Sequence, residues 1–206
     1  MSSVFDPSAQ HGDVDSKVVA ALERLGEVIR LLLREKAQEH NLSLIQARFL
    51  VYLLYHGVEL RRVSQLAREF GLTQATVSDA VDSLEAKGLI GREPWPEDRR
   101  VVTLRLTPEG ELLATELSAW ADPLREHLRE SSPEESEVVM RYLMRLIGSL
   151  QRSGVITVAR MCVTCRFFQR DAHPGAASRH HCGLLDVPLA GSDLRIDCPE
   201  YEPTRS

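Results

Sequence analysis

The sequence predicts a mainly helical chain with one small β-hairpin and a separate C-terminal segment that is rich in cysteine. Apolar residues recur at steps of three and four along most of the cysteine-free part, which is the period of an amphipathic helix. A single short stretch alternates apolar and polar residues instead, which is the period of a strand. All four cysteines follow residue 161. The expected fold class is therefore mainly α with a small β element (α+β), followed by a small irregular module.

The composition narrows the class of protein further. The chain has 206 residues, with 43% hydrophobic and 27% charged residues, which excludes collagenous and wholly disordered chains. Its net charge of −5 does not by itself indicate a nucleic-acid or membrane partner. No apolar run approaches the ~20 residues that span a bilayer, and the first residues lack the basic and apolar regions of a secretory signal. We expect a cytoplasmic protein without a membrane partner.

The first part of the chain contains two long helical patterns. The first covers residues 15–39, with Asp15 or Ser16 as its cap. The second runs from near Ser43 to Gly57, a residue type that commonly ends helices. Because the first helix is long and amphipathic, it has an apolar face to bury against another element.

Two shorter helices follow, with glycine after each of them. They cover residues 63–70 and 73–87, and Gly71 and Gly88 end them. The spacing is that of a helix-turn-helix, whose second helix fits the major groove of B-DNA. An ordinary helical hairpin with a glycine turn would have the same spacing. Polar residues remain on the outer face of the second helix: Thr73, Gln74, Thr76, Ser78 and Asp79.

A hairpin comes next, and its tip is charged. Residues 89–92 and 101–106 are the expected strands, and residues 97–100 at the tip end in Arg99 and Arg100. Adjacent exposed arginines suit contact with phosphates or insertion into a narrow minor groove. Between residues 61 and 105 there are eight Lys/Arg and seven Asp/Glu, so the local charge balance alone does not distinguish this interpretation from a solvated loop.

The remaining helices complete the body of the chain. Thr107-Pro108-Glu109 starts a helix that continues through residues 112–129. Ser132-Pro133-Glu134-Glu135 starts another that reaches about Gln151. The expected organisation is a flexible N-terminus (1–14), a DNA-binding and dimerisation domain (15–152), a linker (153–161) and a cysteine-rich module (162–206).

This order of elements, together with three short motifs, resembles the MarR family of winged helix-turn-helix transcriptional regulators. The motifs are residues 84–90 (LEAKGLI) with Arg92, residues 98–100 (DRR) and residues 106–110 (LTPEG). The resemblance covers residues 15–151. It implies a homodimer joined through its long first and last helices, which binds an inverted repeat in double-stranded DNA. The recognition helices would enter successive major grooves, and the wings would contact adjacent minor grooves.

The resemblance also implies a set of DNA-binding residues. Asp98 would orient the wing-tip Arg100, and Asp79 departs from the family because a basic residue is common at its position. An aspartate there could instead accept a hydrogen bond from a cytosine amine. The expected DNA-binding residues are Thr73, Gln74, Ala75, Thr76, Ser78, Asp79, Arg99 and Arg100.

Members of this family often hold a small-molecule effector in a crevice beside the DNA-binding region. The polar and aromatic residues that could line such a crevice are His40, Tyr52, Tyr55 and His56. The alternative is that the tyrosines lie at the edge of the core and the histidines on the surface.

The cysteines have the spacing C-x2-C-x16-C-x15-C, formed by Cys162, Cys165, Cys182 and Cys198. In a cytoplasmic protein such a cluster is more typical of metal binding than of disulfides. A close pair and two single cysteines can together complete one four-cysteine site. The alternatives are four unrelated thiols, or a disulfide or redox dithiol formed by the close pair Cys162 and Cys165.

The expected metal centre is a 4Fe–4S cluster, with zinc as the alternative. Structural zinc sites usually take two close pairs of ligands, and this segment has one, whereas four thiolates serve a cluster equally well. The spacing and the run from Cys165 to Gln169 (CRFFQ) resemble high-potential iron–sulfur proteins, although the last gap is longer here. His180 and His181 adjoin Cys182 and could replace a cysteine ligand.

The sequence thus predicts a dimeric transcriptional regulator, acting as a repressor, in which a C-terminal iron–sulfur cluster serves as a redox or iron sensor that modulates operator affinity. The alternatives are a winged-helix regulator with a purely structural zinc site, and an electron-transfer or accessory protein that uses the cysteine module. We expect no enzymatic activity, because the sequence shows no nucleophile–base pair, phosphate-binding loop or paired carboxylates.

Overall fold

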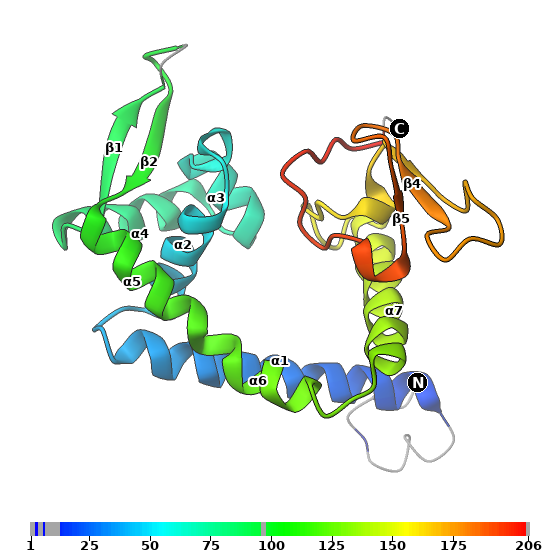
Figure 1. Ribbon diagram of the computed structural model, residues 1–206. Coiled ribbons are helices and arrows are strands. Elements are labelled where there is room, and N and C mark those ends of the chain that lie inside the picture. The colour runs from blue at the N-terminus through cyan, green and yellow to red at the C-terminus, as the bar shows by residue number, and fades with distance from the viewer. Residues whose placement is uncertain (1–2, 4–5, 7–12, 96–97, 205–206) are drawn as a thin grey trace. The chain divides into compact units, whose positions relative to one another are not determined.

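The computed structural model describes residues 3, 6, 13–95 and 98–204. Its α-helices, labelled in Figure 1, are α1 (Val14–Gln38), α2 (Leu44–Tyr55), α3 (Val63–Phe70), α4 (Gln74–Ala86), α5 (Pro108–Ser118), α6 (Asp122–Leu128) and α7 (Pro133–Arg152). Its strands are β1 (Ile90–Pro94), β2 (Val102–Leu106), β3 (Phe168–Gln169), β4 (His180–Cys182) and β5 (Val187–Leu189). Short 3-10 helices lie at Val58–Leu60, Ala119–Ala121, Cys162–Thr164 and Gly191–Asp193.

The described residues form two compact units. Unit 1 contains the described residues up to Tyr55, together with Ala80–Gly91 and Leu106–Leu124. Unit 2 contains His56–Asp79, Arg92–Arg105 and the described residues from Arg125 onward. Unit 2 therefore includes α3, the first turns of α4, most of the hairpin, α7 and all four cysteines.

The caps of the helices follow from short polar side chains. The Asp13 carboxylate accepts hydrogen bonds from the backbone N–H groups of Asp15 and Ser16, at 3.1 and 3.2 Å. The expected cap at Asp15 or Ser16 is therefore wrong, because both residues lie inside the first turn and donate to Asp13 instead. Pro133 lies in the first turn of α7, as the sequence predicts, and Ser132 and Glu135 form a reciprocal capping box there.

The core of unit 1 forms where α2 packs against α1 and α5. The side chains of Phe49, Leu50 and Leu53 on α2 are fully buried. Burying a side chain of this kind stabilises a fold by about 1.5–3 kcal/mol. Helix α2 therefore accounts for much of the apolar burial in this unit, and this explains why its sequence is apolar on almost every face.

The helix expected over residues 112–129 is interrupted in the structure. Helix α5 ends at Ser118, a 3-10 turn covers Ala119–Ala121, and α6 begins at Asp122. Pro123 explains the break, because proline has no N–H to donate to the preceding turn and its ring clashes with the carbonyl four residues earlier. The proline is instead tolerated in the first turn of α6.

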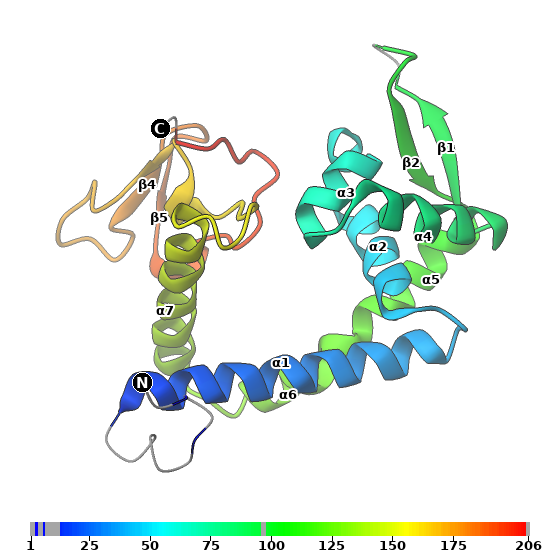
Figure 2. The ribbon, with the colours of Figure 1, turned by 180° about the vertical axis from the view of Figure 1, so that it is seen from behind.

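Unit 2 has its own apolar core, between α7 and the cysteine-rich segment. Its buried residues are Met144, Ala159, Met161 and Leu194. The segment was expected to be irregular, but it contains a three-stranded antiparallel sheet in the order β3-β4-β5, which Figure 2 shows beyond the end of α7. The strands have two or three residues each, too short for the alternating pattern that predicts a strand.

Among the described residues, no helix is both long enough and apolar enough to span a membrane.

The start of α5 lies against the base of the hairpin, and this contact predicts the effect of a substitution. A Cβ added at Gly110 would lie 1.9 Å from the backbone oxygen of Leu89. Gly110→Ala should therefore destabilise the protein by at least about 1–3 kcal/mol through overpacking, which outweighs the ~1 kcal/mol by which alanine favours a helix over glycine. Chemical denaturation would measure the change.

The matched control is Gly91→Ala, because a Cβ at Gly91 meets no atom within 4 Å. If Gly110→Ala is as stable as Gly91→Ala, the close approach between α5 and Leu89 does not exist in the protein.

Candidate nucleic-acid interface and candidate metal centre

The turn between α3 and α4 is built by one glycine and one threonine. Gly71 adopts a left-handed conformation with φ 63°, which glycine reaches without the steric cost that other residues meet. The Leu72 N–H then donates to the Ala67 carbonyl at 2.9 Å. The Thr73 hydroxyl accepts from the Thr76 N–H at 3.2 Å and so caps α4. The turn holds the first residues of α4 in one fixed orientation.

The expected base-facing residues lie at the start of α4. The side chains of Thr73, Gln74, Ala75, Thr76 and Asp79 are exposed, and Ser78 is half-buried. Val77, between them, is fully buried. The hydroxyl oxygens of Thr73 and Thr76 lie 2.9 Å apart, so these two threonines also hold each other in place.

The hairpin formed by β1 and β2 carries the two expected arginines at its tip. Arg99 and Arg100 are exposed, and Glu97 of the expected tip lies outside the described residues. The Asp98 carboxylate accepts the backbone N–H of Arg100 at 3.0 Å, and its carbonyl accepts the N–H of Val101 at 2.9 Å. Asp98 therefore fixes the backbone of Arg100 in this structure, rather than its guanidinium group.

The four cysteines lie around a single pocket in unit 2. Each of them is half-buried, and none of these described thiols forms a disulfide. The strand pairing of Phe168 with Cys182 brings the third cysteine toward the first two. A bridge between Cys165 and Pro203 holds the last residues of the described chain against them. The other residues that line the pocket are Phe167, Phe168, Leu184, Leu185, Leu189 and Glu200.

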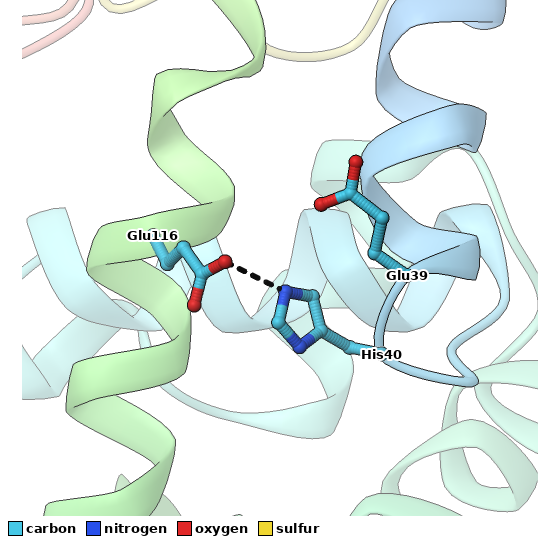
Figure 3. Close-up of side chains that lie close together, drawn as sticks. All are labelled: Glu39, His40 and Glu116. Atoms are coloured by element: carbon cyan, nitrogen blue, oxygen red, sulfur yellow. Dashed lines mark hydrogen bonds and ion pairs between the residues drawn. The ribbon is translucent and has the colours of Figure 1, made fainter.

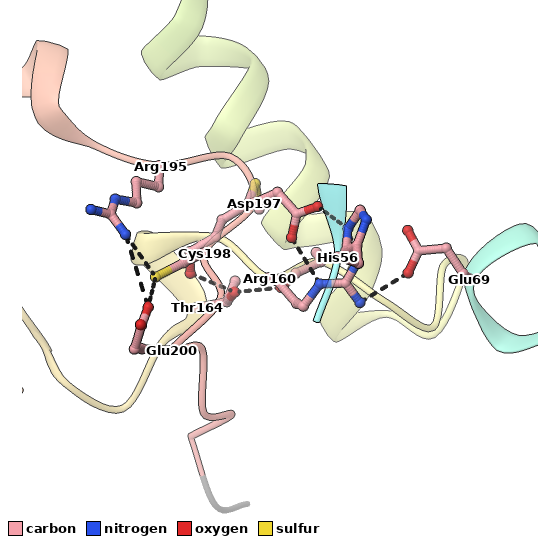
Figure 4. Close-up of polar contacts among 10 residues, drawn as sticks. His56, Glu69, Arg160, Thr164, Arg195, Asp197, Cys198 and Glu200 are labelled. Atoms are coloured by element: carbon pink, nitrogen blue, oxygen red, sulfur yellow. Dashed lines mark hydrogen bonds and ion pairs between the residues drawn. The ribbon is translucent and has the colours of Figure 1, made fainter. Parts of the chain in front are cut away.

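Backbone and side-chain donors point at two of the sulfurs. The Arg195 N–H donates to Cys162 Sγ at 3.2 Å. The Arg195 guanidinium lies 3.8 Å from Cys198 Sγ and 4.0 Å from the Glu200 carboxylate. Figure 4 shows both of these contacts. Burial raises the pKa of Cys162, and the Arg195 N–H partly opposes that shift by lowering it. These donors would stabilise thiolate ligands.

The four sulfurs could hold either of the two metal centres that the sequence suggests. In a tetrahedral zinc site with Zn–S bonds of about 2.3 Å, the sulfurs lie roughly 3.8 Å apart. Four thiolates around one pocket suit either a zinc ion or a 4Fe–4S cluster, in which each thiolate binds a different iron atom.

The two histidines beside Cys182 have other partners. The Asp171 N–H donates to His180 Nδ1 at 3.1 Å. His181 lies between His173 and the Asp186 carboxylate, at 3.2 Å from each. Neither histidine lines the pocket around the four sulfurs.

The expected crevice residues are spread over both units. Tyr52 is buried in α2, whereas the exposed Tyr55 donates to the Ser118 hydroxyl at 3.2 Å. His40 Nε2 lies 3.1 Å from Glu116 Oε1, and His56 belongs to unit 2. These contacts give Tyr55 and His40 structural roles, and the effector crevice stays a prediction.

Two carboxylates and one imidazole lie close together in unit 1, as Figure 3 shows. They belong to Glu39, Glu116 and His40. One ligand atom from each lies within 4.8 Å of the others. However, Lys36 Nζ lies 2.7 Å from Glu39 Oε2 and 3.3 Å from Glu116 Oε1. Hydrogen bonds to these carboxylates raise the pKa of Lys36. The lysine thus supplies the positive charge of the cluster, which joins the end of α1 to α5.

A charged network that the sequence did not indicate connects the cysteine-rich segment to α3. Figure 4 shows the Asp197 carboxylate facing both Arg160 and His56, with Glu69 on the other side of the Arg160 guanidinium. Burial raises the pKa of Asp197, but hydrogen bonds from His56 and Arg160 and their charges lower it to about 2. In the sequence, Asp197 stands out only because it precedes Cys198. Its partner His56 lies 141 residues away along the chain, so no local pattern indicates the contact.

Comparisons with known proteins assign the fold around the helix-turn-helix. Residues 40–101 match the sequence model of the MarR family. The uncharacterised HTH-type transcriptional regulator YdgJ of Bacillus subtilis is 33% identical over 113 residues, which are 54% of this chain and 59% of YdgJ. The chain thus spans less than two thirds of that relative.

Solved structures show the same fold. The Staphylococcus aureus MepR–DNA complex has a TM-score of 0.56 at 24% identity, covering 64% of this chain and 97% of MepR. A second structure, of MepR as a transcription regulator of the S. aureus multidrug efflux pump MepA, has a TM-score of 0.50 at 23% identity, covering 64% and 96% of the two chains. The expected winged helix-turn-helix fold of MarR regulators is confirmed.

Proposed function

We propose that this protein is a cytoplasmic, homodimeric, DNA-binding transcriptional regulator, acting as a repressor, in which a C-terminal 4Fe–4S cluster modulates operator affinity. The observation that carries the DNA-binding part is the exposed, capped start of α4 after the Gly71 turn, followed by a hairpin with exposed Arg99 and Arg100. The match to the MarR family and the fold of MepR support the same class.

The exposed start of α4 suits readout of bases. The N-terminal residues of a recognition helix meet base edges in the major groove, and a glutamine can form two hydrogen bonds with adenine. Gln74 is the exposed residue of this type at the first position of α4. Arg100, whose backbone Asp98 holds, supplies a charge that the minor groove or a phosphate attracts.

Exposed apolar side chains support the homodimer. Val19, Leu25 and Ile29 of α1 are 39–51% exposed, although they lie on the apolar side of an amphipathic helix. Val138, Val139 and Tyr142 of α7 are exposed as well. Apolar residues gathered in this way on helices are typical of surfaces that another chain covers.

The cluster is supported by the pocket around the sulfurs. Four thiols converge on an apolar hollow, and a backbone N–H donates to Cys162 Sγ, which is a kind of contact that tunes iron–sulfur clusters. When bound, such a cluster changes its charge on oxidation or is lost altogether. The chain's own residues hold the four sulfurs around an apolar pocket. A zinc site that is purely structural is the second candidate, and metal analysis distinguishes the two.

Footprinting on duplex DNA tests the regulator directly. We expect the homodimer to protect an inverted repeat whose half-sites lie about one helical turn apart, because two recognition helices related by a two-fold axis meet successive major grooves. A protein that binds as a monomer, or equally to every sequence, would contradict the proposal.

Two substitutions separate the roles of α4 and the hairpin. Arg100→Ala should weaken binding to all sequences and lower the salt slope by roughly one, because it removes one contact with the charged backbone or minor groove. Gln74→Ala should cost about 1–3 kcal/mol at one base pair and relax discrimination there. Binding titrations at several salt concentrations would measure both.

Arg179→Ala serves as the control, because it removes an exposed arginine that pairs with Asp171 outside α4 and the hairpin. If Arg100→Ala and Gln74→Ala gave the same salt and sequence profiles, the roles assigned to them would be wrong.

The metal centre has its own test. Anaerobically purified protein should be brown, and Cys165→Ser should lose the metal and leave residues from about 161 onward sensitive to proteases, because metal binding supplies folding energy. The body of the chain should keep its helical content. Ala172→Ser, on an exposed turn, introduces the same residue type without touching a sulfur. Colourless protein with one tightly bound zinc ion per chain would refute the cluster.

A further inference from the structure

Residues 195–198 form a short segment that contacts two sulfurs of the cysteine pocket. The Arg195 N–H donates to Cys162 Sγ at 3.2 Å, and the Cys162 N–H donates back to the Arg195 carbonyl at 3.1 Å. The segment ends in Cys198 itself, whose Sγ lies 3.8 Å from the Arg195 guanidinium. The segment thus contacts two of the four sulfurs directly.

The same segment contacts Arg160 on its other side. The Cys198 N–H donates to the Arg160 carbonyl at 2.9 Å, and the Arg160 Nε–H donates to Asp197 Oδ1 at 2.8 Å. The side chain of Arg160 is only 11% exposed. Removing a guanidinium from water costs free energy, and the anionic partners of Arg160 offset that cost.

Arg160 and Asp197 in turn contact both ends of the segment that contains α3. Arg160 Nη1 lies 3.0 Å from Glu69 Oε2, and Glu69 lies in the last turn of α3, just before the Gly71 turn. His56 Nε2 lies 2.7 Å from Asp197 Oδ2 and 3.1 Å from Arg160 Nη2. One ring nitrogen cannot donate and accept at once, so the shorter contact, with Nε2–H donating to Asp197, is the hydrogen bond.

A further contact joins the same two parts of unit 2. The Thr157 hydroxyl donates to the carbonyl oxygen of Arg68 at 2.9 Å. Arg68 and Glu69 adjoin each other, so the chain between α7 and the first cysteine contacts the end of α3 through a neutral hydrogen bond and an ion pair. Of these two contacts, the Arg160–Glu69 ion pair is the one that continues to the segment containing Cys198, because Arg160 also pairs with Asp197.

We propose that Arg160 is the positioning residue through which the cysteine pocket sets the position of the end of α3, and with it the start of α4. This inference rests on the proposed function, because it names the contacts by which the metal centre would modulate DNA binding. When the sulfurs move apart or lose their common ligand, residues 195–198 move with them. The Asp197 carboxylate then leaves Arg160 and His56, and the contact with Glu69 loses its support.

The experiment measures hydrogen exchange of the amides in residues 56–70 in the full-length dimer without DNA. Arg160→Met keeps the apolar stem of the side chain and removes its polar contacts with Glu69, His56 and Asp197. It should speed exchange at the end of α3 by roughly tenfold, the effect of losing one hydrogen bond to a charged group, while the metal content stays unchanged. Cys198→Ser should produce the same increase, and the double variant no further increase.

Two more variants keep the test decisive. Glu69→Gln removes only the partner on α3, so it should raise exchange at the same amides even if Arg160→Met folds poorly. Arg160→Lys keeps the charge but cannot contact three partners at once, so its effect should be intermediate. Arg166→Met is the matched control, because it breaks an exposed ion pair with Glu202 in the same module.

The outcomes separate this inference from the proposed function. If Cys198→Ser and Arg160→Met leave exchange in residues 56–70 at the wild-type rate, or if their effects simply add, the positioning role of Arg160 is refuted. If exchange responds as expected but Cys198→Ser binds the operator as tightly as the wild type, the contacts stand and the modulation of DNA affinity by the metal centre is refuted instead.

Discussion

The close approach of α5 to the Leu89 carbonyl is the contact on which the base of the hairpin depends. The Thr107 N–H donates to that carbonyl at 3.1 Å, and the Thr107 hydroxyl both donates to Gly88 and accepts from Gly110. The residue after β2 is thereby joined to the residue before β1. Because Thr107 also caps α5, the same side chain starts the helix and closes the hairpin. A residue larger than glycine at position 110 would separate these elements.

The sequence predicted best where the relevant interactions are local. The boundaries of α3, the turn at Gly71 and the start of α7 at Pro133 all depend on residues within a few positions of one another. The break before α6 was missed even though Pro123 causes it, because the apolar pattern continues through it. The strands of the cysteine-rich module were missed because two or three residues are too few to show a period.

The candidate sites show the same division. Exposure of the polar residues at the start of α4 follows from helical periodicity, and convergence of the four cysteines around one pocket follows from their spacing. The network of His56, Glu69, Arg160 and Asp197 does not follow from any local pattern. Its members are separated by up to 141 residues along the chain, and ionic side chains of this kind occur on the surface of most proteins.

The short strands of the cysteine-rich module have a consequence for the amount of protein in a cell. The strands have two or three residues each, and the core between the module and α7 has four buried residues, so apolar burial contributes little to the stability of this module. On the proposed function, a newly made chain that has not acquired its metal would present about 45 unfolded residues to proteases. Metal supply would then set the abundance of the regulator as well as its state, so a shortage would both alter the surviving molecules and reduce their number.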